Sequence, residues 1–292
     1  MSIPDFVVVG AAKAGTTSIH QYLRQHPRVR LTEPKETFFF TLEETARCQG
    51  VGAEYNGGNV IRTWQAYQGL FASSPSDALT GEICVAYLYF PSAAARIHAA
   101  NPNCQIFIVL RHPVHRAYAN YTHHVRDGLE PLSFGDALAA SAERMSQGYW
   151  WGFDYVGAST YSEQVERYRS IFGAERVEVL FFEDMLERET RFVNQMLRTL
   201  GLAELDGIDA TPMRPGRNGM NLRAYRAQRL GLTWLARRLD PDYWRGSDKL
   251  DPRLGRELFD VYFRADVERL SALLGKRIEL WTSERSNVSS AT

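Results

Sequence analysis

The chain has 292 residues, of which 45% are hydrophobic, so it is long enough for one large α/β domain or two small ones and can bury a substantial core. Its 34 Lys and Arg residues balance its 34 Asp and Glu residues, which argues against a general polyanion-binding surface and a nucleic-acid partner but leaves room for a local basic pocket. The three cysteines, Cys48, Cys84 and Cys104, show no paired spacing, and this indicates reduced thiols and no zinc site.

The first elements have the pattern of a nucleotide-binding loop. Phe6 to Val9 is a continuous apolar run, as expected of a strand that is buried on both faces. A glycine-rich turn follows it. Thr17 to Gln25 then has the spacing of a helix, which Pro27 ends.

The central part of the chain alternates between strand and helix patterns. Glu82 to Tyr89 is typical of a strand or a strand and turn, and Pro91 to Ala100 of a helix. Cys104 to Arg111 is the clearest strand pattern, and a helix is predicted to begin at Pro113.

The pattern continues toward the C-terminus. Arg176 to Met185 predicts a third buried strand, and Glu187 to Leu200 predicts a helix. Residues 209–220 lack a hydrophobic period and predict a long surface loop. Leu222 to Leu239 and Pro252 to Leu274 predict helices.

Strands that alternate with helices predict an α/β fold with a parallel sheet covered on both faces. We expect one domain over residues 1–282 and a frayed polar tail over residues 283–292. No segment has the apolar length that spans a membrane, and residues 1–4 leave no room for a signal peptide before the first strand. We therefore expect a cytoplasmic protein.

The turn after the first strand is a candidate anion site. Unpaired backbone N–H groups and the helix dipole favour a phosphate there, and Gly10 and Gly15 allow its close approach. The ATP-binding loop requires a Gly-Lys-Ser/Thr sequence, but here Thr16 follows Gly15 and the lysine stands earlier, at Lys13. The Lys-Thr pair that holds a γ-phosphate and magnesium is therefore missing. The alternative is an ordinary strand-turn-helix with an incidental lysine.

The stretch "GAAKAGTTSIHQYLRQHPRV", followed by "EPKETFFF", resembles the opening of sulfotransferases that use 3′-phosphoadenosine 5′-phosphosulfate (PAPS). The resemblance is greatest to the branch of heparan-type and many bacterial members. It implies a P-loop NTPase-like three-layer sandwich with a central parallel sheet, and sulfuryl transfer without a metal. It also implies that Lys13 contacts the oxygen between phosphate and sulfur. The other residues implied to bind the 5′-phosphosulfate are Ala14, Gly15, Thr16, Thr17 and Ser18.

Arg111 is a candidate for the 3′-phosphate. It follows the strongest strand, and open parallel sheets bind ligands at the carboxyl ends of their strands. A guanidinium can hold a phosphate through two hydrogen bonds, although a surface charge at a strand end is the alternative. The resemblance implies a serine eight residues further on as a second donor, but this chain has Ala119 there. Asn120 points elsewhere by about 100°, so we expect that the serine contact is lost.

The resemblance implies three further cofactor contacts. Tyr161, at the start of the helical stretch Ser159 to Gly173, would lie near the adenine; its alternative is a half-buried aromatic residue at a helix start. Arg217 and Arg223 would belong to a basic segment that closes over the 3′-phosphate.

An acceptor hydroxyl must lose its proton as it attacks sulfur, and a positioned base assists this step. The resemblance implies that Glu36 is this base and that Lys35 adds positive charge near the sulfate. The stretch Gly81 to Pro91 lacks the histidine that the cytosolic small-molecule branch uses there. It also lacks the lysine of the heparan-type branch, which argues against a densely sulfated polysaccharide as acceptor.

Two groups of residues are weaker candidates for the acceptor site. His123 and His124 could act as acid or base or line the site, but a solvated helix end is the favoured interpretation. Trp150 and Trp151 belong to the aromatic cluster Tyr149 to Tyr155, which could form an apolar acceptor pocket, a lid or a patch of the core.

The sequence thus predicts a PAPS-dependent sulfotransferase. The acceptor would be a small molecule, a lipid or a glycoside, with a hydroxyl favoured over an amine as the attacking group. One rival is a P-loop kinase that uses ATP and magnesium, for which the Walker lysine is missing. The other is a module that binds PAPS, or its product PAP (3′,5′-adenosine bisphosphate), without catalysis, which the Ala119 departure would suit.

Overall fold

The computed structural model describes residues 3–56, 60–211, 227, 232–239 and 250–282. The chain divides into two compact units. The first comprises Met1–Arg47, Tyr55–Arg111 and Tyr161–Thr211, and the second comprises Cys48–Glu54, His112–Thr160 and Pro212–Thr292. The single domain expected over residues 1–282 remains a prediction, and the tail 283–292 lies outside the described residues.

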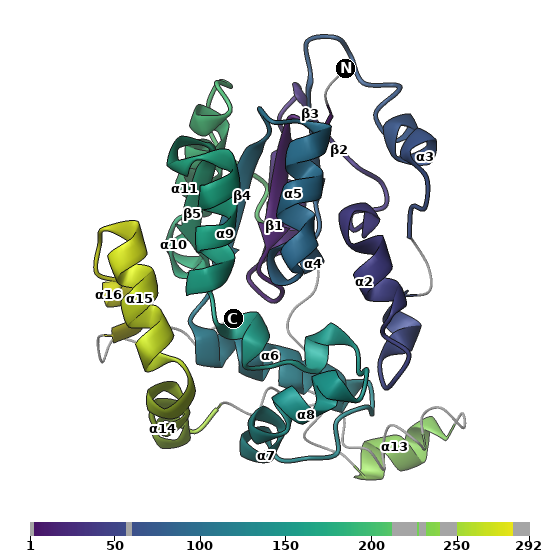
Figure 1. Cartoon of the computed structure of the whole chain (residues 1–292), viewed down its shortest axis with the longest axis vertical. Helices are drawn as coiled ribbons and strands as arrows, with labels where there is room; N and C mark the ends of the chain where they lie inside the picture. Colours follow the sequence, from purple (N-terminus) through teal and green to yellow (C-terminus); the bar gives the residue numbers. More distant parts are fainter. Residues whose placement is uncertain (1–2, 57–59, 212–226, 228–231, 240–249, 283–292) are drawn as a thin grey trace. The chain divides into compact units, whose positions relative to one another are not determined.

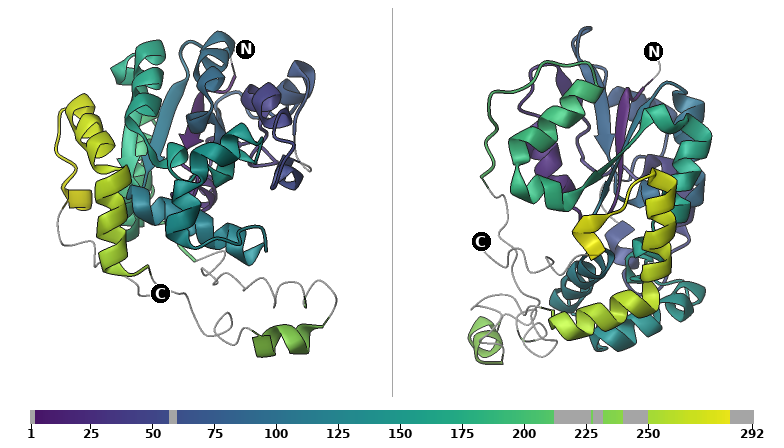
Figure 2. Two further views of the ribbon diagram at one scale, coloured as in Figure 1. Left: turned by 60° about the horizontal axis from the view of Figure 1, so that its bottom comes forward. Right: turned by 90° about the vertical axis from the view of Figure 1, so that its left-hand side faces the viewer.

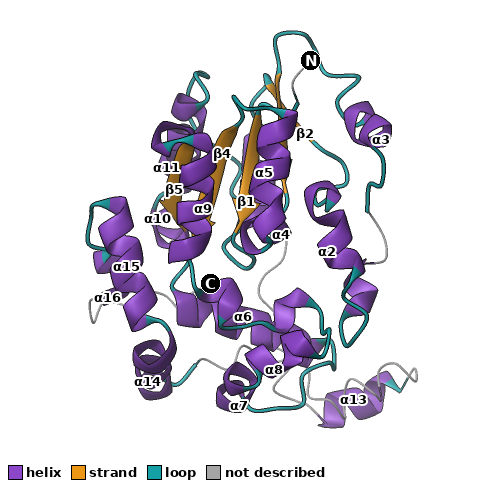
Figure 3. Ribbon diagram, in the orientation of Figure 1, coloured by secondary structure: helices purple, strands orange, loops and turns teal. Residues whose placement is uncertain are grey.

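The first unit is built on a five-stranded sheet in the order β2-β3-β1-β4-β5 (Figures 1 and 3). All neighbouring strands pair in parallel, which confirms the predicted parallel sheet. The strands are β1 (Phe6–Gly10), β2 (Val29–Leu31), β3 (Leu79–Ile83), β4 (Gln105–Leu110) and β5 (Val177–Phe181).

The central strand β1 is buried along its whole length, as its apolar sequence requires. Phe6 is opposite Gly81 of β3 on one side and Gln105 of β4 on the other. The ring of Phe6 lies so close to Gly81 that a Cβ atom there would collide with it. A glycine at this point of β3 therefore allows the two strands to pair around a large aromatic side chain.

Helices cover both faces of this sheet, as the edge-on view in Figure 2 shows. On one face α5 packs against α9, and on the other α1 packs against α11. The helices of the first unit are α1 (Thr16–Leu23), α2 (Leu42–Ala46), α3 (Trp64–Gly69), α4 (Ala86–Tyr89), α5 (Pro91–Ala100), α9 (Ser162–Phe172), α10 (Phe182–Glu187) and α11 (Glu189–Thr199). Short 3₁₀ turns are η1 (Phe39–Thr41) and η5 (Ala174–Arg176). The layers therefore form the predicted three-layer α/β sandwich.

The described part of the second unit is helical. Its helices are α6 (Pro113–Arg126), α7 (Phe134–Ala139), α8 (Ser141–Ser146), α13 (Thr233–Leu239), α14 (Pro252–Tyr262), α15 (Arg264–Leu274) and α16 (Glu279–Thr282), with 3₁₀ turns η3 (Trp151–Phe153) and η4 (Gly157–Ser159). Phe153, Tyr155 and Phe263 are fully buried in it. Among the described residues of both units, we find no helix that is long and apolar enough to cross a bilayer.

Several predicted boundaries were wrong. The stretch Glu82 to Tyr89, predicted as a strand or a strand and turn, leaves the strand at Ile83, and the strand predicted over Arg176 to Met185 ends at Phe181. In both cases a helix continues the apolar run: α4, which is mostly buried, or α10, in which Met185 is buried. The helix predicted over Pro252 to Leu274 is two helices, because the fully buried Phe263 leaves the helical conformation between them. Of the helix predicted over Leu222 to Leu239, only the part within the described residues can be compared, and α13 is helical there.

Candidate active site

The glycine-rich loop runs from the end of β1 into α1. Gly15 has a φ of 76°, and a Cβ atom on it would lie 2.7 Å from the ring of Phe182 and would also meet Met185. The backbone angle favours glycine at this position, and the packing against α10 leaves no room for a side chain. As the N-cap of α1, Gly15 offers no side chain to the first amides of the helix. An uncapped helix start after a parallel strand is suited to bind an anion.

Three of the predicted cofactor residues are brought together beside this loop. The Arg111 Nη1 atom donates a hydrogen bond of 2.9 Å to the carbonyl oxygen of Lys13, whose φ is 65°. The hydroxyl of Tyr161 donates a 2.9 Å bond to the carbonyl oxygen of Arg111. The Arg111 guanidinium also lies over the ring of Phe182, 4.8 Å from its centroid. Arg111 therefore holds the glycine-rich loop through these contacts and is not an isolated surface charge.

Tyr161 differs from the half-buried residue considered as its alternative. It is fully buried at the N-cap of α9, and its hydroxyl is used by the backbone of Arg111. A buried hydroxyl with a partner avoids the cost of an unsatisfied polar group. Its contact with Arg111 joins α9 to the end of β4.

The predicted base also lies at this loop. The Lys35 Nζ atom is 2.6 Å from Glu36 Oε1 and donates to Thr16 Oγ1 at 3.3 Å. The side chains of Lys35 and Glu36 are 19% and 28% exposed, so the pair is partly shielded from water. Lys35 thus connects the candidate base to the first residue of α1. Of the remaining loop candidates, Ala14 is buried, Ser18 is half-buried and Thr17 is exposed.

His123 and His124 belong to the second unit, and they differ from each other. His124 is 2% exposed, its Nδ1 atom is 2.9 Å from the Tyr155 hydroxyl, and its ring stacks on Phe153 with centroids 3.9 Å apart. The expectation of a solvated helix end is therefore wrong for His124, because its ring fills the core of this unit. His123 is half-buried, with Nε2 3.7 Å from Asp127 Oδ2.

The aromatic cluster of the second unit is part of its core. Trp150 and Trp151 are 6% and 5% exposed, so of the three interpretations left open the core patch describes them. Asn120 donates a 2.6 Å hydrogen bond to the carbonyl oxygen of Gly152 in this cluster. Asn120 is therefore committed elsewhere, as its helical position predicts, and the half-buried Ala119 provides only a methyl group.

Two predicted site residues, Arg217 and Arg223, lie outside the described residues. Within the parts of the chain that the structure describes, no group of three or more His, Cys, Asp or Glu side chains is arranged to hold a metal ion. Cys84 and Cys104 are buried free thiols, and Cys48 is a half-buried one.

One residue of the site was missed by the sequence reasoning. Glu82 is a fully buried carboxyl on β3 that receives hydrogen bonds from the hydroxyls of Thr37, Tyr67 and Tyr87. The available signal was a single acidic residue inside a strand that is otherwise apolar. Thr37 directly follows the candidate base, so this buried cluster belongs to the surroundings of the site.

Comparisons with known proteins identify the family of the chain. The profile described as "Sulfotransferase family" matches residues 4–206. The crystal structure of a sulfotransferase from Alicyclobacillus acidocaldarius is similar, with a TM-score of 0.79 and 32% identity over 97% of this chain and 100% of that chain.

Matches to curated proteins cover a smaller share. The membrane-associated sulfotransferase kil1 of Dictyostelium discoideum is 27% identical over 121 residues, which are 41% of this chain and 23% of that protein. The heparan sulfate glucosamine 3-O-sulfotransferase 6 of Mus musculus is 30% identical over 118 residues, 40% of this chain and 30% of that protein. The chain thus matches less than a third of the length of these two relatives.

Proposed function

The chain belongs to the sulfotransferase family, and from this premise we propose that it transfers the sulfuryl group of PAPS to an acceptor hydroxyl. The observation that carries the proposal is the contact of Lys35 with both Glu36 and Thr16. It joins a carboxylate to the start of the helix that would receive the phosphosulfate. In-line transfer needs a base close enough to the bound sulfuryl group to take the proton of the attacking oxygen, and a carboxylate near this loop is suited to that role.

The residues around the loop fit a doubly phosphorylated nucleotide. The uncapped start of α1, with Thr16, Thr17 and Ser18, would hold the 5′-phosphosulfate. Arg111 would hold the 3′-phosphate, since a guanidinium can bind a phosphate through two hydrogen bonds and this one already lies at the loop, where it donates to the Lys13 carbonyl at 2.9 Å. We keep Ala14 and Tyr161 as cofactor contacts in the same proposal, and also Arg217 and Arg223, which lie outside the described residues.

The proposed chemistry balances without a metal. The acceptor oxygen attacks sulfur, its proton passes to Glu36, and the bond between sulfur and the bridging oxygen breaks. The products are the sulfated acceptor, PAP and the proton held by Glu36. Lys13 stabilises the negative charge that develops on the leaving phosphate oxygen.

We propose a small molecule, a lipid or a glycoside as the acceptor, with an amine as the second choice of attacking group. The relative from Mus musculus is named for heparan sulfate. The stretch Gly81 to Pro91 of this chain carries no lysine or histidine, which supports an acceptor with less negative charge than a sulfated polysaccharide. The side chains of His123, His124, Trp150 and Trp151 are buried or engaged in the second unit, which weakens them as acceptor contacts.

The proposal is tested by PAP release from PAPS with three acceptor probes. Octyl β-D-glucoside offers sugar hydroxyls and an apolar tail, 2-naphthol offers a phenol, and glucosamine offers an amine. We expect PAP release with at least one hydroxyl probe, and a decrease in kcat of about 10²- to 10⁴-fold in Glu36→Gln, because the general base is removed. The exposed Glu33→Gln is the matched control, since Glu33 pairs with Arg24 instead of Lys35. Equal rates for Glu36→Gln and wild type would contradict the assignment.

A second candidate function is binding of PAP or PAPS without transfer, which the methyl group of Ala119 favours because it removes one phosphate donor. PAP binding without acceptor-dependent turnover in all three probes would support it. A P-loop kinase lacks support at the loop, where Thr16 occupies the position of the required lysine.

A further inference from the structure

Glu82 is a buried acidic side chain for which the proposed reaction has no direct use. It lies on β3 opposite Val7 of β1 and has no exposed surface. The Tyr67 hydroxyl donates to Oε2 at 2.6 Å, and the Tyr87 hydroxyl donates to Oε1 at 2.8 Å. The Thr37 hydroxyl also donates to Oε1. Three hydroxyls from separate parts of the chain therefore converge on one carboxyl.

The hydrogen bonds around Glu82 have a definite direction. The amide of Phe39 donates to the Thr37 hydroxyl at 3.2 Å, and the amide of Phe40 donates to the Tyr87 hydroxyl at 3.4 Å. The hydroxyls of Thr37 and Tyr87 thus each accept a hydrogen bond from a backbone amide and donate one to the Glu82 carboxyl. Such a chain of donors polarises its members in one direction and ends at the carboxyl. The backbone of residues 37–40 is thereby tied to Glu82 by two routes.

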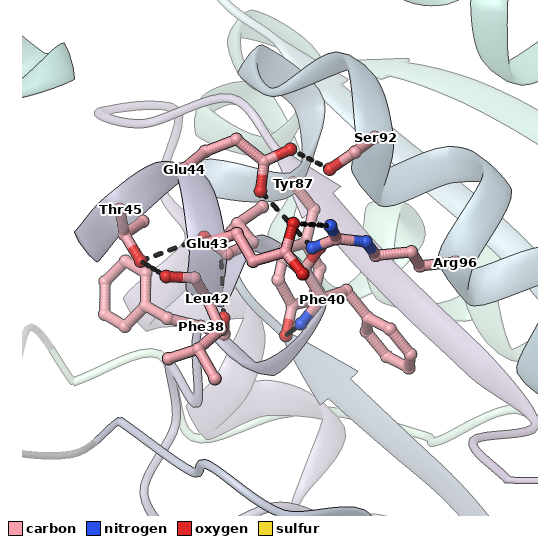
Figure 4. Close-up of polar contacts among 10 residues, drawn as sticks. Phe38, Phe40, Leu42, Glu43, Glu44, Thr45, Tyr87, Ser92 and Arg96 are labelled. Atoms are coloured by element: carbon pink, nitrogen blue, oxygen red, sulfur yellow. Dashed lines mark hydrogen bonds and ion pairs between the residues drawn. The ribbon is translucent and has the colours of Figure 1, made fainter. Parts of the chain in front are cut away.

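The segment held in this way contains an unfavourable backbone conformation. Phe38 has a φ of 54°, which is uncommon for a bulky residue and persists only where surrounding contacts enforce it. On its other side, Arg96 of α5 donates to the carbonyl oxygen of Phe40 at 3.2 Å and pairs with Glu43 and Glu44 of α2 (Figure 4). The turn after Glu36 is therefore fixed at both ends.

We propose that Glu82 is a positioning residue that acts through the Thr37 hydroxyl to hold Glu36 beside Lys35 and the phosphate loop. This inference rests on the proposed function, because it gives Glu82 a role only where Glu36 is the base. Glu82 has no contact with the reacting atoms, since it is fully buried. Its effect passes from the carboxyl to Thr37 and then to the adjacent residue Glu36.

A purely structural role explains the cluster less well. An apolar side chain would fill this position in β3 without the desolvation that a carboxyl suffers. Burial raises the pKa values of Tyr67 and Tyr87 well above 10, so both phenols keep the protons that they donate. A network that is fully satisfied in this way specifies one backbone arrangement.

The test compares two hydroxyl deletions on the same carboxyl. Thr37→Val removes the hydroxyl next to Glu36, and Tyr67→Phe removes the hydroxyl contributed by α3 while keeping the aromatic ring. We expect Thr37→Val to lower kcat about 10²-fold with the KM for PAPS unchanged, because a small displacement of a base has a large effect. Tyr67→Phe should retain kcat within about 3-fold of wild type. Thr37→Ser, which keeps the hydroxyl, should also have a kcat close to that of wild type, in contrast to Thr37→Val. The assay uses whichever of the three acceptor probes gives the highest wild-type rate.

Two further measurements separate positioning from stability. In a Glu36→Gln background, Thr37→Val should cause no additional loss of kcat, because the base that it positions is already gone. Amide hydrogen exchange at Phe39 and Phe40 should be faster in Thr37→Val than in wild type, whereas PAP affinity should be unchanged.

The outcomes distinguish the two proposals. If wild type transfers sulfuryl groups and Thr37→Val keeps the wild-type kcat, the inference about Glu82 is overturned and the proposed function stands. Equal losses in Thr37→Val and Tyr67→Phe, or a further loss in the double variant, would also overturn it. If wild type releases no PAP with any probe, the proposed function fails and the inference falls with it.

Discussion

Two non-glycine residues among those described have a positive φ, and both belong to the candidate site. They are Lys13, at 65°, and Phe38, at 54°. Such conformations cost about 1–3 kcal/mol each and persist where surrounding contacts enforce them. For Lys13 one such contact is the bond from Arg111 to its carbonyl oxygen, and for Phe38 it is the hydrogen-bond chain that ends at Glu82. The unfavourable backbone thus occurs in the loop that would hold the nucleotide and in the turn after the candidate base.

Glu82 should also make the stability of the protein depend on pH. Burial raises its pKa above the ordinary value of 4.5, and this outweighs the opposite effect of the three hydroxyl donors. The folded state then binds the proton more tightly than the unfolded state, so this contribution to stability is present below pH 4.5 and is lost as the pH rises toward the folded-state pKa. Relative to Glu82→Gln, the unfolding free energy of wild type should fall by up to about 1.4 kcal/mol per pH unit in that interval.

This difference can be measured by urea unfolding of both proteins at a series of pH values above and below 4.5. Comparing the two proteins removes the contributions of other titrating groups, and the phenols of Tyr67 and Tyr87 remain neutral throughout because burial raises their pKa values. A difference that is independent of pH, or that grows in the opposite direction, would show that the pKa of Glu82 is not raised.

At the scale of elements, Arg96 of α5 holds α2 through contacts that differ in their exposure to solvent. Arg96 reaches Glu44, whose side chain is 19% exposed, and Glu43, whose side chain is 69% exposed. It also donates to the carbonyl oxygen of Phe40 in η1. Since exposed ion pairs contribute little, the bonds to Glu44 and to the Phe40 carbonyl should account for most of the stabilisation.

We therefore expect Arg96→Ala to lower the unfolding free energy by about 1–2 kcal/mol, and Glu43→Gln to change it by less than about 0.5 kcal/mol. Both values can be obtained from chemical denaturation with a common m-value. Similar losses in the two variants would mean that the exposed pair, and not the bond to the backbone, fastens α2.

The elements that could be predicted from the sequence are those whose first or last residue is marked by a proline or by a change from apolar to charged residues. Pro91 begins α5, and the apolar run before Arg111 defines β4. The end of β5 could not be found in this way, because Phe182 and Met185 of α10 continue the apolar pattern to pack under Gly15. Strand β2, with three residues, is too short to produce a periodic signal.

For the whole molecule, the parallel sheet and the glycine-rich turn between β1 and α1 could be predicted because each follows from contiguous runs of residues. Glu82 could not be recognised, since its partners Thr37, Tyr67 and Tyr87 come from three separate segments. The role of His124 was misjudged for the same reason, because Phe153 and Tyr155 bury it from a distant part of the chain. Contacts of this kind depend on tertiary structure, which a single sequence pattern does not contain.

The central claim is that the loop after β1 holds PAPS and not ATP, and thermal unfolding of the wild-type protein tests it most directly. The protein would be heated alone, with PAP, and with ATP and magnesium. A ligand at about 100 times its dissociation constant stabilises the folded state by about 2.7 kcal/mol, which gives a visible rise in Tm. The account predicts a rise with PAP that is diminished in Arg111→Ala, and no rise with ATP and magnesium. A rise in Tm with ATP and magnesium, and none with PAP, would contradict the claim that the loop holds PAPS.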